Sequence, residues 1–177
     1  GIIHRDLKPE NIMVEKLRSD PDYVKVLDFG IAKIRDFDGS EQSSFKTATG
    51  MVFGTPEYMS PEQIRGEELD GRSDLYSLGV VLYQILADEL PFQGESVLEV
   101  ATAHLTQPPV PLQDKRSDLP LGLCAVVARM MSKKREDRFA TAGEARRALS
   151  ESLDADGAAP APEEDPDVFS RTTSRVD

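Results

Sequence analysis

The stretch that most limits the fold is residues 73–87, SDLYSLGVVLYQILA. Its apolar residues lie almost all round a helical wheel, and Pro91 follows as a helix stop. Because such a helix is buried on every side, this segment predicts a central helix enclosed by other helices. The chain of 177 residues, 39% hydrophobic and 30% charged, is long enough for one such domain.

Shorter segments predict the helices that enclose it. Ser60 and Gln63 form a capping box, with Pro61 at the first helical position and Gly66 as the end. Further helices are predicted over 96–106, over 121–132 and after the capping box of Thr141 and Glu144, with a break at 108–112. We expect 96–106 to be an exposed amphipathic helix, on which His104 is a surface residue.

Two short runs before these helices predict strands. Residues 11–14 and 23–27 are β-prone, and the turn residues at 20–22 between them favour a small antiparallel hairpin. From 28 to 55 the sequence loses its periodicity, which indicates a long irregular loop, and such loops are usually functional.

The charge is uneven along the chain. Of the net charge of -11, more than half lies in residues 151–177, where eight acidic residues stand against two arginines among Pro and Ala. This composition predicts a disordered acidic tail or linker, which leaves 1–150 as the domain. No basic stripe is present, so a nucleic-acid partner is not expected.

Other features bear on location and redox chemistry. The sequence has no apolar run of 18 residues and no signal peptide, so we expect a cytoplasmic location. Residue 1 is Gly and not Met, so we expect the sequence to be a piece of a longer chain. Cys124 lies in an apolar run and predicts a buried, unreactive thiol in preference to a nucleophile.

Three motifs occur in a fixed order: His4-Arg5-Asp6-Leu7-Lys8-Pro9-Glu10-Asn11, then Asp28-Phe29-Gly30, then Ser60-Pro61-Glu62. Together they resemble the catalytic loop, magnesium motif and activation-segment end of protein kinases, and the wider pattern is similar to bacterial, eukaryotic-type (Hanks-type) Ser/Thr kinases. The resemblance implies an α+β kinase-like fold: a mostly helical C-lobe with a small β-hairpin, whose N-lobe is absent from the sequence.

The resemblance also implies roles for single residues. Asp6 would accept the proton of the substrate hydroxyl, while Asn11 and Asp28 would bind Mg²⁺ on ATP. Lys8 would contact the transferred phosphate, and Thr55 would hydrogen-bond the Asp6–Lys8 pair, which favours Ser/Thr specificity. Met13 would lie on the floor of the adenine pocket.

Further roles are structural or regulatory. Glu62 and Arg138 resemble the buried ion pair of the family. Asp74 resembles the anchor for the backbone of the catalytic loop, with Val81 and Ile85 beneath it. His4 would stack on Phe29, which precedes Gly30. Arg5 would receive the phosphate of a phosphorylated Thr47 or Thr49, although both threonines have the plainer reading of ordinary loop hydroxyls.

The favoured function is part of an ATP-dependent Ser/Thr protein kinase that acts on protein substrates. The sequence contains no G-x-G-x-x-G, so we expect these residues alone to be inactive. The alternative is a truncated gene product, or a non-catalytic module that docks a partner through its helices. The family resemblance also admits a kinase dimer, and a membrane contact only through segments outside this sequence.

Overall fold

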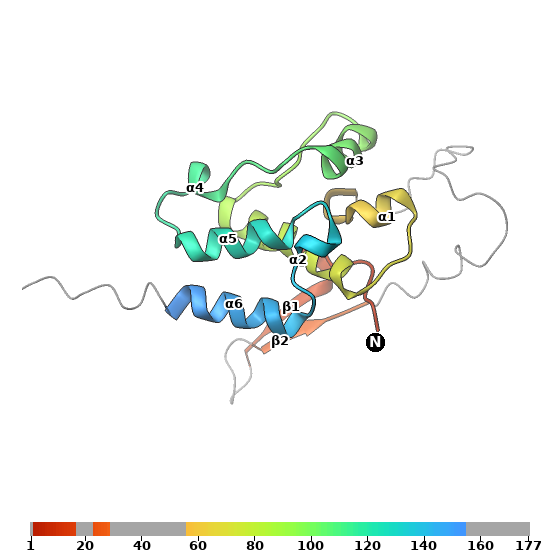
Figure 1. Ribbon diagram of the computed structural model, residues 1–177. Helices are drawn as coiled ribbons and strands as arrows, with labels where there is room; N and C mark the ends of the chain where they lie inside the picture. The colour runs from red at the N-terminus through yellow and green to blue at the C-terminus, as the bar shows by residue number, and fades with distance from the viewer. Residues whose placement is uncertain (1, 17–22, 29–55, 155–177) are drawn as a thin grey trace, which may run out of the picture.

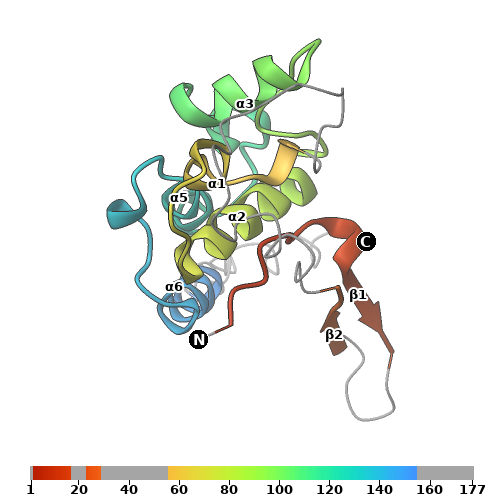
Figure 2. The ribbon, with the colours of Figure 1, turned by 90° about the vertical axis from the view of Figure 1, so that its right-hand side faces the viewer.

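The computed structural model describes residues 2–16, 23–28 and 56–154. A hairpin lies on one side of a helical body that is arranged around α2 (Figures 1 and 2). The described elements, in chain order, are η1 (Pro9–Asn11), β1 (Ile12–Glu15), β2 (Tyr23–Val26), η3 (Pro56–Tyr58), α1 (Pro61–Arg65), α2 (Gly71–Ala87), α3 (Val97–Thr106), α4 (Leu112–Lys115), α5 (Leu121–Met130), η4 (Arg135–Asp137) and α6 (Ala142–Asp154). Within these ranges no helix has both the length and the apolar composition needed to cross a bilayer.

Helix α2 is the central helix that the sequence predicts. Tyr76 and Val80 are fully buried and Tyr83 is 1% exposed, because these side chains face the surrounding helices. The prediction that this helix is buried on every side is wrong, however. Ile85 is 69% exposed, because no described residue covers its side of the last turns of α2. Val81, in contrast, is buried as expected.

Helix α5 packs closely on α2, and glycine makes this approach feasible. A Cβ atom on Gly79 would lie 2.9 Å from Cβ of Met130, which is closer than side-chain carbons normally approach. The free thiol of Cys124 on α5 is buried in an apolar cluster, which confirms the predicted burial. The first apolar cluster thus joins α2, α4 and α5, and a second one joins α2, α5 and α6.

The ends of the helices follow local sequence signals. In α1, Ser60 Oγ accepts from the backbone N–H of Gln63 (3.3 Å), while Ser60 N–H donates to Gln63 Oε1 (3.0 Å), so the capping box is confirmed. Gly66 ends this helix in the left-handed region, at a φ of 68°. The second predicted box also contributes, since Thr141 Oγ1 accepts from the N–H of Glu144 at 3.2 Å.

Helix α6 continues to Asp154, four residues beyond the domain boundary expected at 150. Ser152, expected in the tail, is only 9% exposed. Gly122 explains this burial, because a Cβ atom there would lie 3.0 Å from Cβ of Ser152, so the glycine lets α5 approach the last turns of α6. The remaining residues of the expected tail, 155–177, lie outside the described residues.

Helix α3 is less exposed than the sequence suggests, and the prediction of a surface His104 is wrong. Its imidazole is fully buried, 4.7 Å from the ring of Phe92 between centroids. The physical reason is the helical repeat: Val100, Ala101 and His104 share one face, which packs against the body.

The two strands form the predicted antiparallel hairpin, with Ile12 opposite Val26 and Glu15 opposite Tyr23. One more hydrogen bond extends the pairing, from Leu27 N–H to the carbonyl of Asn11 (2.8 Å). The hairpin stands apart from the helices in Figure 2, and Val14 is 63% exposed.

Candidate active site

The loop that connects the N-terminal residues to the hairpin is held by α2. Asp74, on the first turn of α2, accepts from the backbone N–H of His4 at Oδ2 (2.8 Å) and of Arg5 at Oδ1 (2.9 Å). Arg5 adopts a φ of 70°, a conformation that non-glycine residues rarely take without such support. The structure therefore places Asp74 at the position expected of an anchor for this loop.

His4 links the loop to the end of β2. Its Nδ1 accepts from the backbone N–H of Asp6 (3.3 Å), so the ring proton lies on Nε2, which pairs with the carbonyl oxygen of Leu27 (2.8 Å). The side chain is 4% exposed. Both ring nitrogens are engaged in holding the loop, which is a positioning role. Stacking on Phe29 lies outside the described residues.

Three side chains of the loop lie together. Lys8 Nζ is 3.6 Å from Asp6 Oδ2, and each side chain is about a quarter exposed, at 23% and 25%. Asn11 donates from Nδ2 to the backbone carbonyl of Asp6 (2.8 Å), with a longer contact of 3.5 Å to Asp6 Oδ2. Asp6, Lys8 and Asn11 thus lie together, with the first two partly exposed and Asn11 buried at 6%.

Asn11 and Asp28 have the chemistry to bind a magnesium ion. With Nδ2 of Asn11 committed to Asp6, the amide oxygen is the atom left for a cation. Asp28 is exposed at the end of β2, at a left-handed φ of 51°, and the Leu27–Asn11 hydrogen bond ties the two segments together. Mg²⁺ is commonly bound through one or two protein oxygens and completed by phosphate and water, so this donor set fits.

No larger metal site competes with this pair, since the described ranges hold no cluster of three or more His, Cys, Asp or Glu side chains suited to a metal ion. Met13, expected on the adenine floor, lies on β1 opposite Lys25 and is 44% exposed. The Met13 side chain is therefore accessible from solvent in the described part of the structure.

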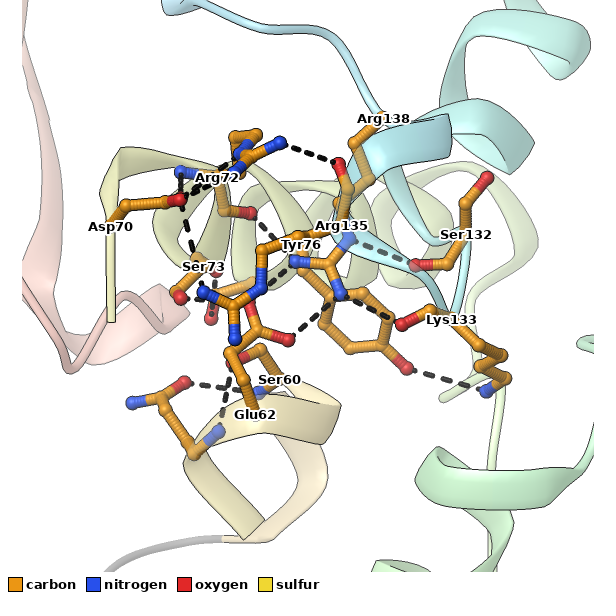
Figure 3. Close-up of polar contacts among 12 residues, drawn as sticks. Ser60, Glu62, Asp70, Arg72, Ser73, Tyr76, Ser132, Lys133, Arg135 and Arg138 are labelled. Atoms are coloured by element: carbon orange, nitrogen blue, oxygen red, sulfur yellow. Dashed lines mark hydrogen bonds and ion pairs between the residues drawn. The ribbon is translucent and has the colours of Figure 1, made fainter. Parts of the chain in front are cut away.

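A buried ion pair joins Glu62 of α1 to Arg138, which follows η4 (Figure 3). Arg138 Nη1 lies 2.6 Å from Glu62 Oε1, Nη2 lies 2.9 Å from Oε2, and both residues are 2% exposed. Ser73 Oγ also donates to Oε1 of Glu62 (2.7 Å). Burial raises the pKa of Glu62, but the hydrogen bonds from Arg138 and Ser73 and the charge of Arg138 outweigh it, so the pKa lies below its usual value.

The ion pair continues into a cluster that the motifs did not reveal. Arg138 lies over the ring of Tyr76 at 4.8 Å, and the hydroxyl of Tyr76 pairs with His104 Nδ1 at 2.9 Å. Lys133 Nζ lies 4.0 Å from the centre of the Phe92 ring. Burial, and then the charge of Arg138, lower the pKa of Lys133 to about 8. Burial, and then the charge of Lys133, lower the pKa of His104 to about 4.

A signal for His104 is present in the sequence, because 97, 100, 101 and 104 repeat at helical spacing and the other three residues of the set are apolar. Five of the expected site residues lie outside the described residues: Phe29, Gly30, Thr47, Thr49 and Thr55.

Two cavities of the described part lie away from this loop. One of about 600 Å³ is lined by charged side chains at the ends of α1 and η4, and one of about 320 Å³ is lined mainly by 108–112 and α5. Neither includes a residue of the 4–11 loop or Asp28.

Comparison with known proteins bears on this site. A family model described as protein kinase domain matches residues 1–150. The chain is similar to the serine/threonine-protein kinase pkn3 of Myxococcus xanthus, with 53% identity over 144 residues that cover 80% of this chain and 26% of the relative. It is also similar to the serine/threonine-protein kinase PknB of Mycolicibacterium smegmatis, with 47% identity over 146 residues, 82% of this chain and 22% of the relative. The chain thus spans about a quarter of the length of these relatives.

Proposed function

The chain belongs to the protein kinase family, in its bacterial Hanks-type serine/threonine group, and on this premise we propose that its N-terminal loop performs ATP-dependent phosphoryl transfer to protein Ser and Thr hydroxyls. The observation that carries the proposal is the convergence of Asp6, Lys8 and Asn11 on a loop anchored by Asp74. A scaffold would need none of these three side chains.

Asp6 is the proposed base. The oxygen of the substrate hydroxyl forms a bond to the γ-phosphorus while the bond from that phosphorus to the β,γ-bridging oxygen breaks, and ADP leaves. The hydroxyl proton passes to the carboxylate of Asp6. Phosphoryl transfer depends mainly on alignment and charge stabilisation, so a carboxylate on a loop that Asp74 anchors is suited to this role.

Lys8 is the proposed contact for the transferred phosphate. Its ammonium lies beside Asp6, at 3.6 Å, so an oxygen of the phosphate can meet a positive charge next to the base. Together with Thr55, which lies outside the described residues, Lys8 would set the preference for Ser and Thr over Tyr.

Asn11 and Asp28 are the proposed ligands of Mg²⁺ on ATP. The cation would supply charge neutralisation to the phosphates when it is bound. The side-chain oxygens of Asn11 and Asp28 would bind the cation at the junction of the loop and the hairpin. Met13 would be an apolar contact for the adenine ring of ATP.

Regulation and context are further parts of the proposal. Phosphorylated Thr47 or Thr49 would pair with the guanidinium of Arg5, the residue directly before Asp6 in sequence. We infer that a lobe with a glycine-rich loop and a strand lysine completes the nucleotide cleft, since the 177 residues contain no G-x-G-x-x-G. A cytoplasmic location, as the cytoplasmic domain of a membrane-anchored parent, belongs to the same proposal.

The test uses the kinase encoded by the complete gene. Asp6→Asn should lower the rate of phosphate transfer to a Ser/Thr peptide by roughly 10²–10⁴-fold. Asp88→Asn makes the same chemical change at the end of α2, outside the site, and should keep the rate. An Asp6→Asn enzyme as active as the wild type, or equal transfer to a Tyr peptide, would contradict the proposal.

A further inference from the structure

The side-chain amide of Gln63 joins α1 to the catalytic loop. Its Nε2 donates to the backbone carbonyl of Arg5 at 2.8 Å, and its Oε1 accepts from the backbone N–H of Ser60 at 3.0 Å. A carbonyl can only accept and a backbone N–H can only donate, so the two partners fix which end of the amide points to the loop. The side-chain amide of Gln63 thus links α1 to a residue 58 positions earlier in the sequence.

The bonded carbonyl belongs to the peptide group that precedes Asp6. Arg5 stands at a φ of 70°, and its N–H is held by Asp74 Oδ1 at 2.9 Å. Gln63 holds the carbonyl of the same residue, so both polar backbone groups of Arg5 are fixed from two different helices. Because the peptide plane between Arg5 and Asp6 is rigid, its orientation sets the direction in which the Asp6 side chain leaves the backbone.

The bond to Arg5 is not part of the helix cap. The capping box of α1 needs only Oε1 of Gln63 and Oγ of Ser60, whereas Nε2 reaches out of the helix to the loop. A side chain that served the cap alone would have its amide nitrogen in solvent.

We propose that Gln63 is a positioning residue for Asp6, which makes the orientation of the base depend on the position of residues 56–65. The expected effect on kcat rests on the proposed function. The expected effect on the order of the loop rests on the geometry alone. Gln63 touches neither reacting group, and acts through the Arg5–Asp6 peptide.

Gln63→Glu isolates the relevant bond. The substituted side chain keeps an oxygen for Ser60 N–H, but it replaces the Nε2 donor with an oxygen that faces the Arg5 carbonyl. In the kinase encoded by the complete gene, kcat should fall roughly tenfold while KM for ATP stays within about twofold, because alignment and not binding is lost. The matched control is Ser96→Ala, which removes the N-cap of α3, where Ser96 Oγ accepts from Glu99 N–H at 3.2 Å, and leaves the loop untouched. A kcat no lower than that of Ser96→Ala overturns the proposal, and so does a KM for ATP that rises as kcat falls.

Amide hydrogen exchange of the protein encoded by the complete gene provides a readout that needs no activity. Exchange at residues 4–6 should be several-fold faster in Gln63→Glu than in wild type or Ser96→Ala, since the loop loses one of its two anchors. Acidification that protonates the introduced carboxylate should restore protection relative to wild type, because a carboxylic acid can donate to the Arg5 carbonyl. Unchanged exchange at 4–6 overturns the positioning role. Faster exchange in the Gln63→Glu chain, found together with a wild-type kinase that transfers no phosphate, supports the positioning and contradicts only the proposed function.

Discussion

Arg138 and Glu62 meet as a fork, with two parallel hydrogen bonds of 2.6 and 2.9 Å between residues 76 apart in sequence. The guanidinium also donates to the backbone carbonyls of Ser132, Arg72 and Lys133, so each of its three nitrogens has an acceptor. Such a pair is not a strong source of net stability, because taking two charges out of water is costly. Loss of one partner, however, leaves the other charge buried without compensation, which is strongly unfavourable.

Removing one partner of this pair should therefore cost more than removing both. We expect Glu62→Met or Arg138→Met to lower the free energy of unfolding by about 3–5 kcal/mol, and the double variant to be less destabilised than either single one. Urea denaturation of the four proteins measures this. As a control, Asp118→Asn at the exposed pair of Arg116 and Asp118 should leave the unfolding midpoint unchanged. Additive losses at 62 and 138 would contradict the expectation.

The buried His104 predicts a specific loss of stability in acid. Its folded-state pKa of about 4 lies below the ordinary 6.5, so the unfolded chain binds this proton first as the pH falls. The neutral ring contributes its full stability above pH 6.5, and the contribution is lost between pH 6.5 and 4, by roughly 3 kcal/mol. His104→Gln keeps a polar side chain and removes the titration. The stability difference between wild type and variant should shrink over this window; a difference constant with pH would exclude the effect.

The close approach of α2 and α5 predicts that alanine substitutions at two glycines of α2 differ in their effect on stability. Gly79→Ala should cost about 1–3 kcal/mol, because the new Cβ would press on Met130. Gly71→Ala places a Cβ with nothing within 4 Å, and should change stability by less than about 0.5 kcal/mol. Thermal unfolding compares them directly, and equal losses at both positions would count against the packing argument.

The 177-residue chain alone should transfer no measurable phosphate to a Ser/Thr peptide and should bind ATP weakly. The 177 residues contain no G-x-G-x-x-G to cover the phosphates, so most of a bound nucleotide would stay in water. Radiolabelled transfer and calorimetric ATP titration test both parts, with the kinase encoded by the complete gene as the positive control. Robust transfer by the chain alone would refute the expectation.

Local signals in the sequence predicted the local structure well. The antiparallel hairpin, the capping box at Ser60 and the central helix all depend on residues close in sequence, whose preferences act before tertiary packing. The family motifs in turn pointed to Asp74 and to the Glu62–Arg138 pair, which the structure brings into contact with their expected neighbours.

What could not be predicted depends on contacts between distant segments. The burial of His104 requires knowledge of where Tyr76 and Phe92 lie, and the exposure of Ile85 depends on what does not cover α2. The contact of Gln63 with Arg5 needs the loop and α1 to be adjacent. From the sequence alone, the capping box is already a sufficient reason for a glutamine at this position. The extent of α6 likewise depends on a distant contact, since its last turns pack where Gly122 leaves room for them.

The anchoring of the loop by Asp74 has a consequence for synthesis on the ribosome. His4 and Asp74 are 70 residues apart, and Glu62 lies 76 residues before Arg138. At about 5–20 residues per second, the first interval alone lasts roughly 4–14 s, during which the acid, lysine and asparagine of the loop lack their fixed arrangement. A nascent chain that stops early therefore carries the motif without the anchored loop, so the order of translation itself delays assembly of the loop until the helical body has emerged.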